Sequence, residues 1–220
     1  MRIEWIAENR SRVVVVFFNG WGMNAHAVSH LEKDCDVVMI YDYRDLECTE
    51  LSSLQDYEKV YVVAWSMGVW AAANTLPKLG IKTDYCIAVN GTERPVDDEA
   101  GISLQAYCLT ENGMDERGRA KFFMRMLAGK EELMRFEEQK PDRELAEQLE
   151  ELKAIRKQSE TCCNTIKWDR GLIAEKDVIF PTSNQLNWWS GKTTVHMLPG
   201  GHYPFYNFQS WEELIDFEVS

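Results

Sequence analysis

Continuous apolar stretches recur along the chain and are separated by polar or amphipathic segments. Most are rich in valine, isoleucine and aromatic residues, a composition typical of strands that are covered on both faces, as in a parallel sheet. The predicted strands are Met1–Ile6, Val13–Phe18, Asp36–Tyr41, Val60–Ala64, Asp84–Asn90, a short apolar strand within 168–181, and Thr193–Leu198. Helices or loops alternate with the strands, and this order predicts a parallel, doubly wound α/β sheet.

The region 103–167 interrupts this alternation with helical periodicity. Apolar side chains recur on two helical faces with charged residues between them, and Pro141 separates the two faces. They are Phe122, Phe123, Met126 and Leu127 on the first face, and Leu145, Leu149, Leu152 and Ile155 on the second. The pattern predicts a core in two parts, 1–102 and 168–220, with a helical insertion between them. Such an insertion is typical of a lid over the carboxyl edge of the sheet, and a dimerisation arm is the alternative.

The stretch Val60–Asn74 combines an apolar strand, a serine between small residues and an alanine-rich helical run. A tight turn from strand to helix needs small residues two positions before and after its central residue, and Ala64 and Gly68 meet that need. Ser66 would then stand at the carboxyl end of the strand, with the backbone N–H of Met67 directed toward the same space. The simpler alternative is a serine that caps the helix.

A loop with two glycines, Asn19–Asn24, directly follows the strand Val13–Phe18. Glycines at the carboxyl end of a strand let the backbone approach a ligand closely. The loop is therefore placed to supply a second backbone N–H to an oxyanion hole, from Trp21. The alternative is an ordinary turn before a helix expected over Ala25–Leu31.

Two further loops each follow a predicted strand and carry a residue suited to acid–base chemistry. Asp177 follows a short apolar strand, a position that can hold a carboxylate at the edge of the sheet. His202 lies in a glycine-rich loop, from which an imidazole can reach both a serine and an aspartate. We expect His196, inside a strand, to be structural, and His26 and His30, on a predicted helix, to lie at the surface.

Composition and charge narrow the classes of function. A chain of 220 residues with 45% hydrophobic content can bury the core of one α/β domain. The formal net charge of −12 argues against nucleic acid as a partner, because phosphate binding needs a concentrated basic surface. Residues 117–157 hold eleven Lys or Arg against nine Asp or Glu, a local +2, and the remainder holds thirteen against twenty-seven, or −14. The insertion is thus the one mildly basic region.

The amino terminus and the cysteines bear on cellular location. No basic segment followed by an apolar signal core is present at the amino terminus, and the longest apolar run, Val13–Phe18, is too short to cross a bilayer. We therefore expect a cytoplasmic protein. The six cysteines form no C-x-x-C pair and have no histidines at zinc-binding spacing, so free thiols are expected.

Four ordered motifs resemble a known family. They are Phe18–Asn24, Ala64–Gly68, Glu175–Pro181 and Gly200–Phe205. The order serine, acid, histidine, each after a strand, looks like that of α/β-hydrolases. More narrowly, the motifs resemble the pimeloyl-acyl carrier protein methyl ester esterases of biotin synthesis, and the short BioG type in particular, over nearly the whole chain. The resemblance implies an α/β-hydrolase fold with a mostly parallel central sheet and a helical lid insertion.

The resemblance also implies a role for each motif residue. Ser66 would be the nucleophile, and His202 would act first as general base and later as acid. Asp177 would orient His202 and stabilise its imidazolium. The backbone N–H groups of Trp21 and Met67 would bind the tetrahedral oxyanion.

Two features of the sequence depart from the family pattern or leave a choice open. Ala64 stands where glycine is commoner, although alanine keeps the position small. Asp97 and Asp98 follow the strand after the serine, which is the alternative position of the acid in some hydrolases. They remain a second candidate for the acid.

The implied enzyme is a cytoplasmic serine esterase that removes the methyl group from pimeloyl-acyl carrier protein methyl ester, with no metal or organic cofactor. An acyl carrier protein is acidic, so an acidic enzyme must present a local basic surface to it. The available cations of the insertion are Lys121, Arg125, Arg135, Lys153, Arg156 and Lys157. We expect this carrier as the partner, neither nucleic acid nor membrane, and a monomer. Another small-acyl esterase or thioesterase, or an inactive hydrolase-fold binding protein, are the alternatives.

Overall fold

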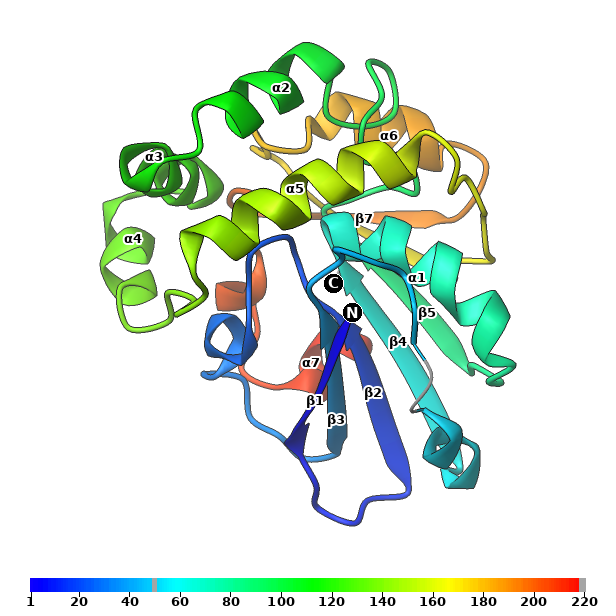
Figure 1. Cartoon of the computed structure of the whole chain (residues 1–220). Coiled ribbons are helices and arrows are strands. Elements are labelled where there is room, and N and C mark those ends of the chain that lie inside the picture. Colours follow the sequence, from blue (N-terminus) through cyan, green and yellow to red (C-terminus); the bar gives the residue numbers. More distant parts are fainter. Residues whose placement is uncertain (49–50, 218–220) are drawn as a thin grey trace.

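A seven-stranded sheet runs through the centre of the molecule (Figure 1). The structure, a computed structural model, describes residues 1–48 and 51–217. The strands are β1 (Arg2–Ala7), β2 (Val13–Phe18), β3 (Asp36–Tyr41), β4 (Lys59–Trp65), β5 (Tyr85–Val89), β6 (Arg170–Ala174) and β7 (Thr194–Leu198). Their order is β1-β3-β2-β4-β5-β6-β7, and every neighbouring pair except β1 and β3 is parallel. The predicted mostly parallel sheet is confirmed.

Strands β2 and β1 show how burial decides the character of each strand. Residues 14–18 of β2 are at most 1% exposed, because β2 lies between β3 and β4 and is covered on both faces. In β1, exposed and half-buried side chains alternate at first, as expected for an edge strand with one face toward solvent. The segment 8–12 between β1 and β2 is too short for the crossover that two parallel strands need, so β1 runs opposite to β2. It accordingly pairs antiparallel with β3.

Helices connect the parallel strands and pack against the sheet (Figure 1). The α-helices are α1 (Met67–Leu79), α2 (Leu104–Asn112), α3 (Glu116–Met126), α4 (Lys130–Phe136), α5 (Leu145–Ser159), α6 (Thr182–Trp189) and α7 (Trp211–Ile215). Short 3-10 helices span Ala25–Val28, Ser52–Asp56 and Phe205–Asn207. None of the helices in the described part of the chain is long and apolar enough to span a lipid bilayer.

The helix expected over Ala25–Leu31 is a single 3-10 turn, so this prediction was too long. The side chain of Asn24 accepts a hydrogen bond from the N–H of His26 and starts the turn at Ala25. Soon after the turn, the N–H of Glu32 donates to the carbonyl of Gln209 at 2.8 Å. This bridge to a distant segment extends the chain and ends the helical run.

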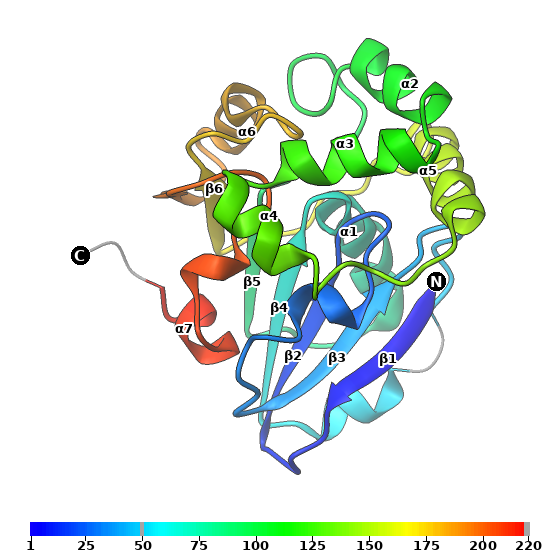
Figure 2. The same cartoon turned by 90° about the vertical axis from the view of Figure 1, so that its left-hand side faces the viewer.

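Helices α2 to α5 all lie within residues 103–167, between β5 and β6 in the chain (Figures 1 and 2). They cross above the carboxyl ends of the central strands, and we call this region the helical insertion. The hydroxyl of Tyr107 in α2 donates to the carbonyl of Leu152 in α5 at 2.8 Å. Phe123 of α3 and Phe136 of α4 pack edge to face, with ring centroids 5.4 Å apart. These buried contacts join α2 to α5 and α3 to α4 in the layer over the sheet.

Candidate active site

Ser66 lies at the sharp turn between strand β4 and helix α1. Its backbone φ of 59° is in the left-handed region that residues with a side chain seldom adopt, so the turn holds this serine under strain. A Cβ added to Gly68 would lie 2.2 Å from the carbonyl oxygen of Phe18, so the turn tolerates only glycine there. The N–H of Ser66 donates to the carbonyl of Val89 at 2.9 Å and ties the turn to the neighbouring strand.

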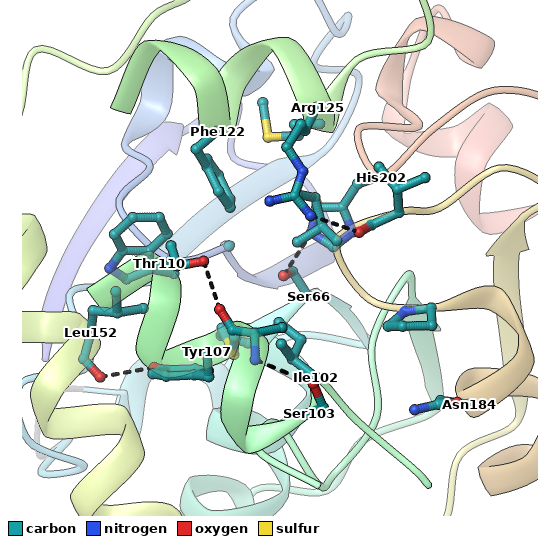
Figure 3. Close-up of a pocket in the computed structure, with 18 of the residues that line it drawn as sticks. Ser66, Ile102, Ser103, Tyr107, Thr110, Phe122, Arg125, Leu152, Asn184 and His202 are labelled. Carbon is teal, nitrogen blue, oxygen red and sulfur yellow. Dashed lines mark hydrogen bonds between the residues drawn. The ribbon is translucent and has the colours of Figure 1, made fainter. Parts of the chain in front are cut away.

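The structure brings Ser66, His202 and Asp177 together at the carboxyl edge of the sheet. His202 Nε2 lies 2.8 Å from Ser66 Oγ, a contact drawn in Figure 3, and His202 Nδ1 lies 2.8 Å from Asp177 Oδ2. The three side chains come from the chain segments that follow β4, β7 and β6. An ionised carboxylate only accepts hydrogen bonds, so Nδ1 donates to Asp177 and Nε2 accepts from the serine hydroxyl. This arrangement can activate a serine as a nucleophile.

Asp177 is held by donors on both of its oxygens. Its Oδ1 accepts from the backbone N–H groups of Ile179 and Phe180, at 2.9 and 2.8 Å. Its Oδ2 accepts from the side-chain amide of Gln185 at 3.0 Å as well as from His202. These bonds fix the orientation of the carboxylate. Gln185 was not predicted as part of the site, because a glutamine in an amphipathic helix carries no pattern that indicates a buried partner.

Asp97 and Asp98, the second candidates for the acid, have other partners. Asp97 Oδ1 accepts from the backbone N–H groups of Glu99 and Ala100, at 2.9 and 2.8 Å, and so stabilises a turn. Asp98 Oδ1 accepts from the N–H of Leu104 at 3.1 Å, at the start of α2. Asp98 also lines the cavity described below. The geometry thus favours Asp177 as the partner of the histidine.

His202 is positioned through its own backbone carbonyl. This oxygen accepts from the indole N–H of Trp65 and from the side-chain amide of Asn90, both at 2.9 Å. The side-chain oxygen of the same Asn90 amide accepts from the N–H of Ala174 at 2.7 Å. Asn90 therefore connects the ends of β5 and β6 to the loop that carries the histidine. Like Gln185, it was not foreseen from the sequence.

The remaining histidines lie away from the serine. His196 is half-buried in β7, and His26 is exposed, as expected. His30 was expected at the surface but is half-buried, with its Nε2 3.1 Å from the carbonyl of Phe205. Burial lowers the pKa of His30 below its ordinary value. None of the contacts described for these three histidines involves Ser66.

A cavity of about 280 Å³ opens directly onto Ser66 (Figure 3). Its walls are mainly apolar, with side chains from the core and from the helical insertion. Apolar lining residues include Met23, Ile102, Tyr107, Phe122, Leu152 and Ile179. A largely apolar pocket with a few polar groups near the reacting atoms is suited to an acyl chain.

Trp21 and Met67, the predicted oxyanion-hole residues, line this same cavity beside Ser66. Met67 is the first residue of α1, where backbone N–H groups lack partners within the helix. Trp21 lies in the loop after β2, and its ring packs edge to face on Phe122 with centroids 4.9 Å apart. We call residues 19–24 the oxyanion loop. Both residues thus border the cavity into which a substrate carbonyl at the serine would project.

The six predicted carrier-binding cations occupy different surroundings. Arg125 lines the cavity and donates to the carbonyl of Val178 at 3.2 Å. Arg156 is engaged in a two-pronged ion pair with Glu111, at 2.8 and 3.1 Å. The guanidinium of Arg135 stacks on the ring of Tyr206, 3.9 Å from its centroid. Lys121, Lys153 and Lys157 are exposed.

A groove of about 480 Å³ lies between α2 and α3, next to the cavity. The groove and the cavity share four lining residues, which are Ala106, Thr110, Phe122 and Arg125. Arg117 and Lys121 line the outer part of the groove, together with the exposed Leu109. The groove therefore brings cations of the insertion next to the wall of the cavity that contains Ser66.

The family model described as pimeloyl-ACP methyl esterase BioG matches residues 1–214 of the chain. The crystal structure of BioG from Haemophilus influenzae is similar over 98% of this chain and 100% of that one, with a TM-score of 0.89 and 32% sequence identity. An α/β-hydrolase enzyme from a Medee basin deep-sea metagenome is similar over 100% of this chain and 94% of that one, with a TM-score of 0.60 and 13% identity. The latter likeness concerns the fold alone, and it confirms the predicted α/β-hydrolase fold.

A longer protein also matches the chain. Malonyl-[acyl-carrier protein] O-methyltransferase of Bacteroides fragilis is 39% identical over 192 residues, which are 86% of this chain and 39% of that protein. The chain therefore spans well under half the length of that relative.

Proposed function

The chain belongs to the BioG family of pimeloyl-ACP methyl esterases, which are carboxylic ester hydrolases, and from this membership we propose that it hydrolyses the methyl ester of pimeloyl-acyl carrier protein in biotin synthesis. The observation that carries the proposal is the hydrogen-bonded series from Asp177 through His202 to Ser66, which opens onto an apolar cavity. We propose these three as the catalytic residues, and the N–H groups of Trp21 and Met67 as the oxyanion hole.

In the proposed first half-reaction, Ser66 Oγ attacks the ester carbonyl carbon while His202 Nε2 takes its proton. The backbone N–H groups of Trp21 and Met67 stabilise the negative charge on the carbonyl oxygen. His202 then gives the proton to the methoxy oxygen, the bond to that oxygen breaks, and methanol leaves. The pimeloyl group remains as an ester on Ser66.

In the second half-reaction, water attacks this acyl-enzyme with His202 again as general base. Collapse of the tetrahedral intermediate returns the proton to Ser66 Oγ and frees the carboxylate of the pimeloyl group. Asp177 stays ionised throughout and stabilises the transient imidazolium. The four hydrogen bonds to its two oxygens support that role.

We further propose the groove between α2 and α3 as the path of the carrier's prosthetic arm. The methyl ester lies at the end of the acyl chain remote from the carrier, so the chain must enter the cavity with its ester first. Exposed Arg117 and Lys121 line the groove, and Arg125 lines both the groove and the cavity that contains Ser66. These cations match an acidic carrier and the phosphate of its arm. In this role residues 103–167 act as a lid that also receives the partner.

The name of the B. fragilis relative bears on the substrate. A protein that O-methylates malonyl-carrier protein makes a methyl ester on a carrier protein. This is the type of bond that we propose for hydrolysis here.

The direct test uses pimeloyl-carrier protein methyl ester and follows methanol release and the new carboxylate on the carrier. We expect turnover by the wild type and none by Ser66→Ala. Release of the acyl group from the carrier would instead indicate a thioesterase. Absence of turnover, together with no labelling of Ser66 by a fluorophosphonate, would indicate an inactive binding protein.

The carrier-docking proposal is tested by charge reversal at the groove. Arg117→Glu with Lys121→Glu should raise KM for the carrier-bound ester by about tenfold and leave 4-nitrophenyl acetate hydrolysis unchanged. Lys153 and Lys157, also predicted as carrier-binding, line neither the groove nor the cavity, so Lys153→Glu with Lys157→Glu is the matched control on α5. Arg125 and Arg156 are less suitable because Arg125 lines the cavity and Arg156 pairs with Glu111. Added salt should mimic the groove variant, since screening acts over a Debye length of about 8 Å at 0.15 M. An equal loss with both substrates would show that the groove cations shape the pocket and do not dock the carrier.

A further inference from the structure

Helix α5 of the insertion is hydrogen-bonded to the oxyanion loop at Trp21 and Gly22. The N–H of Gly22 donates to Glu151 Oε2 at 3.2 Å, and the carbonyl of Gly22 accepts from the side-chain amide of Gln148 at 2.8 Å. The indole N–H of Trp21 donates to the backbone carbonyl of Gln148 at 2.8 Å. Three hydrogen bonds therefore hold two consecutive residues of the loop against a single turn of α5.

Glu151 also binds a second loop of the core. Its Oε1 accepts from the N–H of Tyr43, in the loop after β3, at 2.9 Å. Its Oε2 also accepts from Arg143 Nη1 at 2.6 Å. The side chain is 0% exposed, and burial raises its pKa, while Arg143 and the Tyr43 N–H act in the opposite direction. A buried acid is costly unless its oxygens are hydrogen-bonded, and here both oxygens are.

The backbone of the oxyanion loop depends on these contacts for its orientation. Gly22 has a φ of +73°, and a Cβ there would lie 3.2 Å from Gln148 Nε2, so the residue is both conformationally unusual and closely covered. With the Trp21 side chain and the following peptide both held by α5, rotation of the loop about Trp21 would break several buried bonds. These bonds therefore restrict the positions open to the Trp21 backbone, which borders the cavity beside Ser66.

We propose that Gln148 and Glu151 are positioning residues that set the geometry of the oxyanion hole, so that docking of α5 on the core is required for full turnover. The proposal rests on the proposed function only in assigning the Trp21 N–H to the oxyanion. It gives the insertion a second role beside that of a pocket wall. Neither residue touches the substrate, and both act through the loop.

The test compares Gln148→Met and Glu151→Gln with Glu150→Gln. Methionine keeps the length of Gln148 without its polar atoms, and the amide of Glu151→Gln accepts with only one oxygen. Glu150 is on the same helix with its side chain 66% exposed, so it provides the matched control. The measurements are kcat and KM for 4-nitrophenyl acetate, Ki for a trifluoromethyl ketone that forms a tetrahedral adduct on Ser66, and Tm.

We expect kcat to fall by about tenfold to a hundredfold in both variants, less than complete loss of one oxyanion donor, with KM changed by less than about threefold. The Ki of the ketone should rise by the same factor as kcat falls, because its adduct also needs the hole. The control should match the wild type. A role in stability alone would lower Tm and leave Ki unchanged, and that result in Gln148→Met would overturn the proposal.

Two further outcomes separate this proposal from the function itself. If Glu151→Gln does not fold, Gln148→Met decides the matter, because Gln148 carries no buried charge. If the wild type cleaves 4-nitrophenyl acetate but not the carrier-bound methyl ester, the proposed substrate is wrong, and a coupled loss of kcat and ketone affinity would still support the positioning role.

Discussion

The core and the helical insertion build one site by different means. In the core, Ser66, Asp177 and His202 follow the parallel strands β4, β6 and β7, and hydrogen bonds that involve the backbone hold each of them at the same edge of the sheet. The insertion contributes none of these three, but it supplies cavity walls, the groove cations and the contacts to the oxyanion loop. Under the proposed function, the difference teaches that bond cleavage is assigned to residues held at the sheet edge, whereas substrate access and loop geometry depend on how a separate layer packs on the core.

The largest effects are expected from removal of the core's own chemistry. Ser66→Ala and His202→Ala should each lower kcat for any ester by about 10⁶-fold, by analogy with serine proteases, without loss of the fold. Steady-state kinetics and circular dichroism measure the two properties. A folded variant that retained a substantial fraction of wild-type kcat would break the comparison, since chemistry would then have to come from elsewhere.

The assignment of Asp177 as the acid can be tested by removing its charge. Asp177→Asn should lower kcat by about 10⁴-fold, because the amide favours the tautomer of His202 whose Nε2 cannot accept the serine proton. Asp97→Asn and Asp98→Asn are the matched controls, and their kcat should stay near the wild-type value. A loss of kcat in either control, with Asp177→Asn unaffected, would show that the acid lies in the loop after β5.

Stability should separate the two regions as well. Gly68→Ala, at the turn in the core, should lower the free energy of unfolding by about 3 kcal/mol, because the added Cβ meets the Phe18 carbonyl at 2.2 Å. Gly129→Ala, in the insertion, should change it by less than about 0.5 kcal/mol, since nothing lies within 4 Å of its added Cβ. Urea denaturation of both variants measures the contrast. Equal losses would show that the insertion is packed as tightly as the turn.

The smallest expected effect is the pH dependence of an ion pair inside the insertion. This pair joins Glu111 to Arg156, and the hydrogen bonds from Arg156 hold the pKa of Glu111 below its ordinary value. The unfolded chain therefore takes up a proton at this site at higher pH than the folded chain, and the pair's stabilisation, present above the unfolded pKa, is lost as pH falls through the folded pKa. Glu111→Gln should be less stable than the wild type by at most about 1 kcal/mol at pH 7. This gap should close in acid, and a gap independent of pH would exclude the ion pair as its cause.

Sequence reasoning succeeded where a residue's place follows from local backbone pattern. The strand Val13–Phe18 was predicted with its observed bounds, because a short run of valine and phenylalanine is typical of a strand buried on both faces. Ser66, Asp177 and His202 were each placed in a loop after a predicted strand, and the resemblance to α/β-hydrolases implied that the three act together. What could not be predicted is which polar side chain of a helix turns inward. Glu151 reaches Gly22 across 129 residues of chain, and an acidic residue in an amphipathic helix ordinarily faces solvent.

The positive φ of Ser66 has a consequence for attempts to make this protein more robust. Glycine adopts such a conformation without steric penalty, so Ser66→Gly should relieve strain of about 1 kcal/mol or more at the turn. Directed evolution that selected for thermal tolerance alone would therefore favour the residue that abolishes the nucleophile. A selection that is meant to keep Ser66 must therefore screen for activity in the same round. At this position thermal stability favours glycine, whereas activity requires serine.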